Sequence, residues 1–395
     1  MIRRLLFLLC LAPACASAPP LDPHPPPAEE APGPAPLPVA GPAEEDPQAI
    51  DAGAAPAVTG SGVPLDAPMT AAPVESPSPR VARGTGTPSD KQLEVGDKAY
   101  ASSDFAGAER AYRAAAALDA KDPAPIVGVA RARLAKDNVS TDFNGGPGNR
   151  TLLAMVIELK RAAALDDRYS PAHLELGRAL LVLGRADEAL VSLKRAVDLA
   201  PSDAEAHSAL GVAHVASGKL PDAVRELTRA AELAPGDAER HTNLGTALLA
   251  SGKTPEAIRA FERASKLAPN DARTLNDLGT ALLAANDPDR AIPHLQAAVG
   301  RDPQRATYRQ NLGYAFHLKG DAVKAMALYR EALQLDPKLA SAWINLGNAL
   351  ARGGKYKEAR ESYMKAHALD PTDPRVKAVL VELEGLEKGG ARAAP

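Results

Sequence analysis

The sequence predicts an all-α protein in which short helix pairs stack into an elongated solenoid. Three observations favour this fold class. A 34-residue pattern repeats without a gap over residues 170–373, each unit carries a Leu-Gly pair followed by two spaced alanines, and a proline closes each unit. A fixed period of this length is typical of arrays in which one helical unit cannot bury its apolar face alone and stacks on its neighbours.

Four residue columns define the consecutive units 170–203, 204–237, 238–271, 272–305, 306–339 and 340–373. The Leu-Gly pairs are Leu176-Gly177, Leu210-Gly211, Leu244-Gly245, Leu278-Gly279, Leu312-Gly313 and Leu346-Gly347. The first alanine column holds Ala189, Ala223, Ala257, Ala291, Ala325 and Ala359, and the second holds Ala196, Ala230, Ala264, Ala298, Ala332 and Ala366. The closing prolines are Pro201, Pro235, Pro269, Pro303, Pro337 and Pro371.

Each unit is interpreted as two short helices. An aspartate such as Asp203 or Asp237 suits the N-cap of the first helix. A glycine is the expected end of that helix, and Asn286 replaces it in one unit, as expected where the backbone is left-handed. The glycine and alanine columns let the two helices approach closely, and a large residue fills the space that remains. These large residues are Leu193, Leu227, Phe261, Leu295, Tyr329 and Tyr363.

On these motifs the sequence resembles the tetratricopeptide repeat family. The resemblance extends over residues 89–385 and implies a right-handed α-solenoid of about eight repeats. In this family the first helix of each pair lines a concave groove, and polar side chains there contact a partner. The resemblance therefore implies a binding array as well as a fold.

The two ends of the array are less regular than its centre. Poorer copies of the unit occupy residues 89–122 and 123–169, and the second copy is split by an insertion at 137–150 that we interpret as a surface loop. An amphipathic helix is predicted at 374–385, where it would cover the open end of the stack. Residues 386–395 are expected to form a flexible tail.

Residues 1–18 have the features of an export signal. Arg3 and Arg4 precede a short apolar core from Leu5 to Ala12, which is too short to span a membrane and has the length of a signal-peptide core.

Two ways of processing this signal remain open. The stretch that ends at Cys15 resembles a bacterial lipobox, which implies that Cys15 is lipidated and becomes the new N-terminus. The alternative is ordinary cleavage, for example after Ala16, and the mature protein would then carry no anchor.

Residues 19–88 have a composition different from the array that follows. They hold 19 of the 36 prolines of the chain. A stretch this rich in proline and alanine cannot bury enough apolar surface to fold alone. We therefore expect a disordered linker that acts as a tether between the N-terminus and the array.

The composition excludes several classes of function. The 46 basic and 49 acidic residues give a net charge of −3, so no basic excess is present to attract nucleic acid. Both cysteines, Cys10 and Cys15, lie in the first fifteen residues, so the array has no disulfide and no thiolate metal site. No cofactor is expected.

A histidine column raises the question of a metal site. His173, His207 and His241 occupy the same place in successive units. Neighbouring repeats are displaced by roughly 10 Å, whereas zinc ligands lie about 2 Å from a shared centre. The histidines are therefore expected to fill the bulky slot that Leu275 and Trp343 occupy elsewhere, and no metal site is predicted.

The candidate binding surface is the groove along the first helices. One column there reads Glu175, Ala209, Asn243, Asp277, Asn311 and Asn345. Over its last four units it resembles the asparagine ladder in the repeats of O-linked N-acetylglucosamine transferase, which holds an extended peptide by its backbone. An asparagine amide suits this role because it offers both a donor and an acceptor. The alternative is that Asn-Leu-Gly is simply a common tripeptide in repeats of this kind and that its asparagine lies on a solvated face.

The positions next to this column on the first helices hold mostly polar, uncharged residues, so an uncharged groove is expected. The candidate partner-binding residues are Asn243, Asp277, Asn311, Asn345, Thr246, Thr280, Tyr314 and Asn348.

The resulting expectation is a non-enzymatic scaffold that binds a protein or peptide partner in the groove. The resemblance to bacterial tetratricopeptide lipoproteins of the cell envelope places it on the periplasmic side of the outer membrane, where it would serve assembly of a machine such as a pilus or secretion system. The alternative is a periplasmic, secreted or surface-exposed interaction or adhesion protein without a lipid anchor. Catalysis would require a partner in trans, because no second globular domain is predicted.

Overall fold

The computed structural model describes residues 80–137, 148–373 and 376–380, and within them it is all-helical. The first helices of the eight pairs are α1 (Pro88–Ala101), α3 (Ala124–Lys136), α5 (Ser170–Val182), α7 (Ala204–Ala216), α9 (Ala238–Ala250), α11 (Ala272–Ala284), α13 (Ala306–Leu318) and α15 (Ala340–Arg352). The second helices are α2 (Phe105–Leu118), α4 (Arg150–Leu165), α6 (Ala186–Leu199), α8 (Leu220–Leu233), α10 (Thr254–Leu267), α12 (Pro288–Arg301), α14 (Ala322–Leu335) and α16 (Tyr356–Leu369). The predicted all-α solenoid of eight helix pairs is confirmed.

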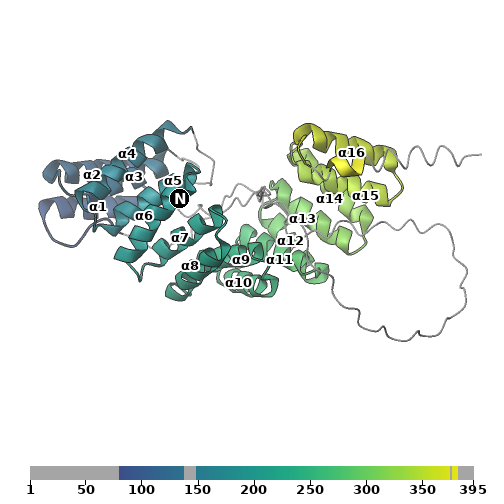
Figure 1. The fold of residues 1–395 in the computed structure, drawn as a ribbon, viewed down its shortest axis with the longest axis horizontal. Helices are drawn as coiled ribbons and strands as arrows, with labels where there is room; N and C mark the ends of the chain where they lie inside the picture. Colours follow the sequence, from purple (N-terminus) through teal and green to yellow (C-terminus); the bar gives the residue numbers. More distant parts are fainter. Residues whose placement is uncertain (1–79, 138–147, 374–375, 381–395) are drawn as a thin grey trace, which may run out of the picture.

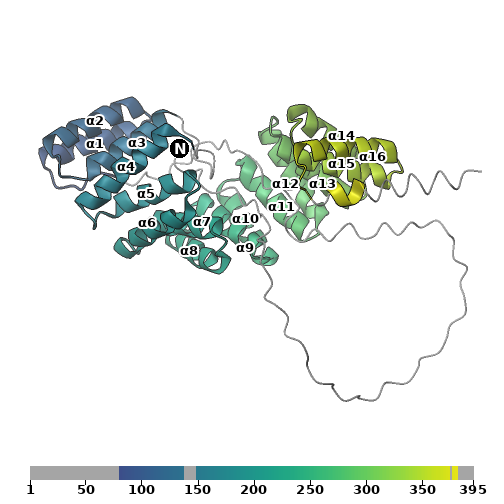
Figure 2. The same cartoon turned by 45° about the horizontal axis from the view of Figure 1, so that its top comes forward.

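The pairs follow one another in chain order from α1 at one end of the array to α16 at the other (Figure 1). Each helix packs against the next one along the chain, and each first helix also contacts the first helix of the following pair. Among the described residues, no comparable contact joins the second helices. The first helices are therefore closer together and lie on the inner side of the stack. We call this surface the first-helix side. Figure 2 shows the same stack, with its pairs again in chain order, in a turned view.

The helix ends follow the predicted capping chemistry. The Asp203 carboxylate accepts hydrogen bonds from the backbone N–H groups of Glu205 and Ala206 at the start of α7. Glycines such as Gly184 and Gly252 end the first helices with φ of 74° and 73°. Asn286 takes the same left-handed conformation with φ of 57°, as predicted for the unit that lacks the glycine.

The two helices of a pair meet at the glycine of the Leu-Gly motif. A Cβ atom added at Gly177 would lie 2.4 Å from Cγ of Leu193, and one added at Gly245 would lie 2.8 Å from the Phe261 ring. The same relation holds for Gly211, Gly279, Gly313 and Gly347 and the large residue sixteen positions later. The large residues therefore fill the space beside the glycines, as predicted.

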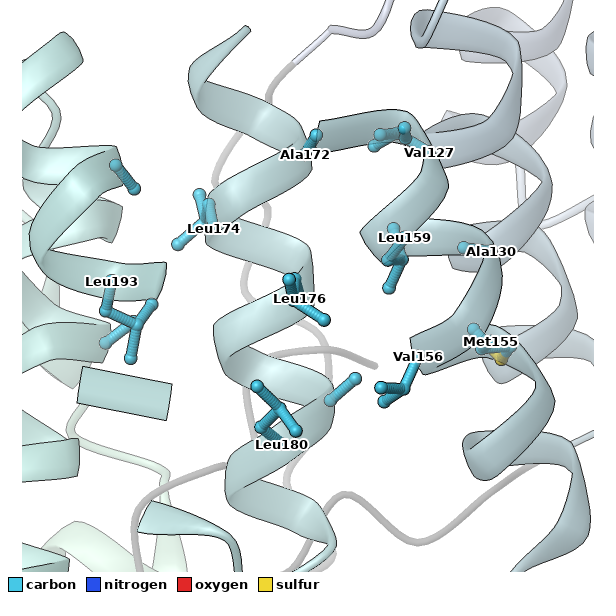
Figure 3. Packing of buried hydrophobic residues seen from close by; sticks show 14 of the residues in the cluster. Val127, Ala130, Met155, Val156, Leu159, Ala172, Leu174, Leu176, Leu180 and Leu193 are labelled. Atoms are coloured by element: carbon cyan, nitrogen blue, oxygen red, sulfur yellow. The ribbon is translucent and has the colours of Figure 1, made fainter. Parts of the chain in front are cut away.

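The core is a series of apolar clusters along the array and not a single centre. Figure 3 shows one of them, in which Val127 of α3, Met155 and Leu159 of α4, and Leu176 of α5 pack together. Further clusters follow along the chain, and the last one ends with Val376. Each pair thus buries its apolar faces mainly against its sequence neighbours.

The described array extends beyond the expected N-terminal boundary at residue 89. Helix α1 begins at Pro88, and the backbone from residue 80 is placed against the first repeats, with the Val81 side chain only 1% exposed. At the other end residues 376–380 are helical, and Val376 is buried where a capping helix is expected. The predicted signal peptide with Cys15, most of the predicted linker, the centre of the insertion and the predicted tail lie outside the described residues.

None of the helices in the described ranges is both long and apolar enough to cross a membrane.

The contact between Gly177 and Leu193 leads to a stability prediction. Gly177→Ala is expected to lower the free energy of unfolding by about 1–3 kcal/mol, because the new methyl group overlaps a buried side chain. Chemical denaturation followed by circular dichroism measures the change. Gly236→Ala is the control, since a Cβ atom there meets nothing within 4 Å. Equal effects of the two substitutions would contradict this packing role.

Candidate functional site

The predicted ladder lies on the first-helix side, but its central members are buried between repeats. Asn243 is 0% exposed, and its Nδ2 donates a hydrogen bond to Oγ of Ser208, 3.1 Å away in the preceding repeat. Asn311 is 3% exposed, and its Nδ2 donates to Oδ1 of Asn276 at 2.9 Å. These amides thus join one repeat to the next, and a peptide cannot reach them without side-chain movement.

The threonines of the predicted set have the same internal role. Oγ1 of Thr246 donates to the carbonyl of Thr242, one turn earlier in α9. Oγ1 of Thr280 accepts a 3.4 Å hydrogen bond from Asn311 Nδ2. Both side chains are buried, so they support the first-helix side without being exposed on it.

Asp277 is buried beside an arginine of its own helix. Its Oδ2 lies 3.5 Å from Nε of Arg273, one turn earlier in α11. Burial raises the pKa of Asp277 to about 6 in spite of this arginine, because desolvation of the carboxylate outweighs the attraction between the charges.

The remaining three predicted residues are partly exposed and lie in the last repeats. Asn345 and Asn348 are on α15, and Tyr314 is on α13. Asn348 Oδ1 accepts a 2.6 Å hydrogen bond from the hydroxyl of Tyr363, which fixes its orientation. The Tyr314 ring stacks on His317 with a centroid separation of 6.4 Å. The accessible part of the predicted site is therefore its C-terminal end.

The expectation of an uncharged groove is wrong for the N-terminal half of the array. Arg131 Nε of α3 lies 2.8 Å from Glu175 Oε1 of α5, and both side chains are almost fully buried. In the next repeats, Glu205 lies between Arg178 at 2.6 Å and Arg240. These charges neutralise one another across repeat boundaries, which explains how a charged column can remain buried.

The ion pairs could have been noticed in the sequence. Arg131 and Arg178 lie in the central turns of consecutive first helices, and Glu175 and Glu205 lie on the first helix that follows each of them. The repeating pattern does not reveal this pair, because the insertion lies between its members. Arg131 and Glu175 are 44 residues apart, which is longer than one unit.

The histidine column bonds to the loop between repeats. Nε2 of His173, His207 and His241 donates to the carbonyl oxygen six residues earlier, at 3.0 to 3.1 Å. Trp343 Nε1 donates to Pro337 in the same way. The column is thus a set of side-chain donors that hold the loop between one repeat and the next. Leu275 cannot share this role because its side chain has no donor.

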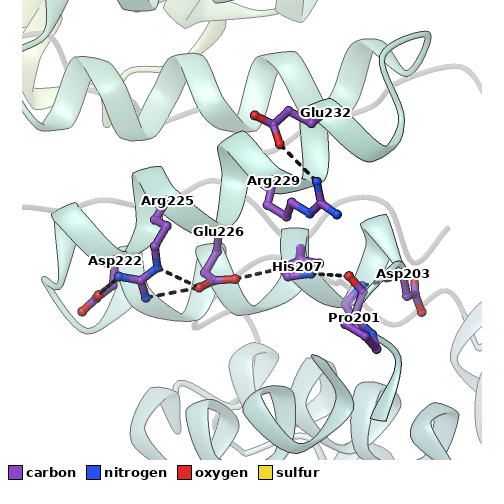
Figure 4. Close-up of polar contacts among 9 residues, drawn as sticks. Pro201, Asp203, His207, Asp222, Arg225, Glu226, Arg229 and Glu232 are labelled. Carbon is purple, nitrogen blue, oxygen red and sulfur yellow. Dashed lines mark hydrogen bonds and ion pairs between the residues drawn. The ribbon is translucent and has the colours of Figure 1, made fainter. Parts of the chain in front are cut away.

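His207 makes an additional contact in this column. Its Nδ1 lies 2.8 Å from Oε2 of Glu226, while Nε2 bonds the carbonyl of Pro201 (Figure 4). Arg225 lies on the other side of the same glutamate. Within the described residues, no group of three or more histidine, cysteine or acidic side chains is placed to hold a metal ion.

The raised pKa of Asp277 gives a pH prediction. The folded protein binds the proton of this carboxyl more tightly than the unfolded chain, so stability falls as the pH rises from about 4 to about 6. The wild type should therefore lose on the order of 2 kcal/mol of unfolding free energy relative to Asp277→Asn when the pH is raised from 4 to 7.

Denaturation curves at several pH values test this expectation. Asp198→Asn, at an exposed place on α6, controls for the loss of one acidic residue. A constant difference between Asp277→Asn and the wild type across this pH range would contradict the shift.

Comparisons with known proteins agree with this architecture. Family models described as tetratricopeptide repeat match residues 174–238 and 276–340, residues 236–302, and residues 316–383. The matches together run over residues 174–383. A search among curated protein sequences finds no match.

Among solved structures, the chain is similar to one in the crystal structure of the APC/C hetero-tetramer Cut9-Hcn1, with 17% identity and a TM-score of 0.56. That match covers 76% of this chain and 57% of the other, and at this identity it concerns the fold alone. Pseudomonas aeruginosa pilF matches with 21% identity and a TM-score of 0.47, over 55% of this chain and 98% of its own. YrrB, described as a TPR protein with an unusual peptide-binding site, matches with 22% identity and a TM-score of 0.38, over 47% and 96%.

The helix pairs, the glycine contacts and the family matches lead to one assignment. The chain belongs to the tetratricopeptide repeat family.

Proposed function

We propose that the chain is a protein-interaction scaffold that binds an extended segment of a protein partner on the first-helix side of its last repeats. The family assignment supports a scaffold of this class. The observation that carries the specific proposal is the partial exposure of Tyr314, Asn345 and Asn348 on adjoining first helices. Their amide and hydroxyl groups can pair with the N–H and C=O groups of a peptide backbone.

The distribution of charge supports the same location. In the N-terminal half the first-helix side is occupied by paired arginines and glutamates, such as Arg131 and Glu175. In the last repeats amides and hydroxyls replace them, and Ser341 Oγ donates to Gln310 Oε1 at 2.7 Å across the repeat boundary. A peptide bound there would not have to separate a buried ion pair, which is costly.

The proposed scaffold is exported and tethered to a membrane. Support comes from the short apolar core after Arg3 and Arg4 and from the lipobox-like stretch that ends at Cys15. Each buried methylene of an acyl chain adds about 0.8 kcal/mol to membrane binding, so a multiply acylated cysteine anchors a protein firmly. The setting would be the periplasmic face of a bacterial outer membrane, in assembly of a pilus or secretion system.

The second candidate is a secreted or surface-exposed interaction protein without an anchor. It is favoured by the departure of residues 11–15 from a regular lipobox, because the leucine stands one place early and Pro13 is unusual. The two candidates share the binding surface and differ only in the fate of Cys15.

The anchor is tested by replacing its cysteine. Cys15→Ala should move the protein from the membrane fraction to the soluble fraction, and mass spectrometry of the wild-type N-terminus should find a diacylglyceryl cysteine. Cys10→Ala is the matched control and should remain membrane-bound. A mature wild-type protein that begins at Ser17, or membrane retention of Cys15→Ala, would contradict the anchor.

The binding surface is tested by site-specific photo-cross-linking in cells. A photoreactive residue at Tyr314 should cross-link to a protein partner, and Asn345→Ala together with Asn348→Ala should reduce the yield at least about fivefold, because two backbone contacts are lost. The same photoreactive residue at Gln296, exposed on second helix α12, is the control. An equal yield from both positions, or an unchanged yield in the double variant, would contradict the proposal.

A further inference from the structure

A short segment at the start of the described chain occupies a binding site on the first repeats. Residues 80–87, here called the cis segment, precede α1 and lie against α1 and the loops that lead into α3 and α5. Val81 is 1% exposed and belongs to the apolar cluster of these repeats. The segment has no helical backbone of its own, so its ordering depends on contacts with the array.

One carboxylate holds the backbone of the cis segment. Asp97 of α1 accepts hydrogen bonds from the N–H of Val81 at 3.0 and 3.1 Å and from the N–H of Ala82 at 3.0 Å. The hydroxyl of Tyr112 donates to the same carboxylate at 2.9 Å and fixes it. The hydroxyl of Tyr169 donates to the carbonyl of Val81 at 3.3 Å. These contacts recognise a peptide backbone and do not depend on its side chains.

A second carboxylate continues the contact. Asp90, which is buried, accepts from the N–H of Arg83 at 2.7 Å and from the N–H of Gly86 at 3.1 Å. Carboxylates that accept N–H groups form hydrogen bonds stronger than those between neutral partners. Backbone groups from Val81 to Gly86 are thus held by two acidic side chains of one helix.

The side chain of Arg83 has a site of its own. Its guanidinium carbon lies 4.4 Å from the centroid of the Tyr169 ring. One of its nitrogens lies 3.1 Å from Asp122 Oδ1 and 3.7 Å from Asp166 Oδ2. An aromatic face with two carboxylates from two different repeats matches the planar charge of an arginine.

The site that the cis segment occupies is negatively charged. Asp90, Asp97, Asp122 and Asp166 all contact the cis segment, and the Arg83 side chain lies beside the last two. The neighbouring Arg131 is paired with Glu175. With the cis segment displaced, four carboxylates and the Tyr169 ring would face an incoming ligand, and a cationic peptide is the ligand that fits them.

We propose that this surface is a binding site for an extended arginine-containing peptide, and that the cis segment is a built-in competitor for it. The preferred ligand has a small apolar residue two positions before an arginine, as Val81 precedes Arg83. Because the competitor is covalently attached, its effective concentration is in the millimolar range. A peptide from another molecule therefore binds only when it is locally abundant or when the cis segment is pulled away.

The test uses the full chain and a fluorescein-labelled peptide with the sequence of residues 80–87. In the variant Val81→Asp/Arg83→Asp the cis segment should leave the site, and fluorescence anisotropy should show binding at least about tenfold tighter than to the wild type, because the tethered competitor is gone. A peptide with glutamine in place of the second arginine should bind at least tenfold more weakly, since it lacks the charge that Asp122 and Asp166 contact.

Two further variants separate competition from other effects. Asp122→Ala/Asp166→Ala in the released background should abolish peptide binding while circular dichroism shows intact helices. If the double variant does not fold, Arg83→Gln is a milder change that takes its place. It should also raise the affinity for the labelled peptide.

Equal affinity of the peptide for wild type and released variant would overturn the proposal, and so would failure to bind a folded released variant. The outcome is independent of partner cross-linking at Tyr314, because the two sites lie at opposite ends of the array.

Discussion

The close contact between a glycine of one helix and a large side chain of the next underlies the whole array. In the regular repeats a Cβ atom at that glycine would lie within 2.4 to 2.8 Å of the partner side chain. Contacts of this kind fix the separation of the two helices in a pair. Once the pair is fixed, the first helices of successive repeats are brought together on the inner side. Both proposed binding surfaces are formed by first helices or by the loops that lead into them, and they depend on this packing.

Buried polar contacts then set how one repeat sits on the next. In the N-terminal half these are ion pairs such as Arg131 with Glu175, and further along they are amide contacts such as Asn311 with Asn276. Buried ion pairs contribute little net stability, and their better-supported role is to specify one arrangement over others. The same side chains therefore join one repeat to the next, and the groups that they bond are not accessible to a partner.

The features that could be predicted from the sequence are those determined within one repeat. The glycine contacts, the left-handed Asn286 and the helix caps depend on residues fewer than twenty positions apart, so a periodic pattern reveals them. The burial of Asn243 and Asn311 depends on the separation of neighbouring repeats, which no single unit contains. The composition of residues 80–87 predicts that they belong to the linker, whereas in the structure the bond from Tyr169 to Val81 spans 88 residues. Contacts between residues so far apart in the sequence do not appear in the repeating sequence pattern.

Both proposals depend on the ability of the array to hold an extended chain by its backbone. Amide hydrogen exchange of residues 81–86 in the full chain measures this property directly, because the Val81, Ala82, Arg83 and Gly86 amides are bonded to Asp97 and Asp90. We expect these amides to exchange at least about tenfold more slowly than in an unstructured peptide, and we expect Asp97→Ala to remove the protection of Val81 and Ala82. Exchange at the rate of a free peptide in the wild-type chain would contradict it.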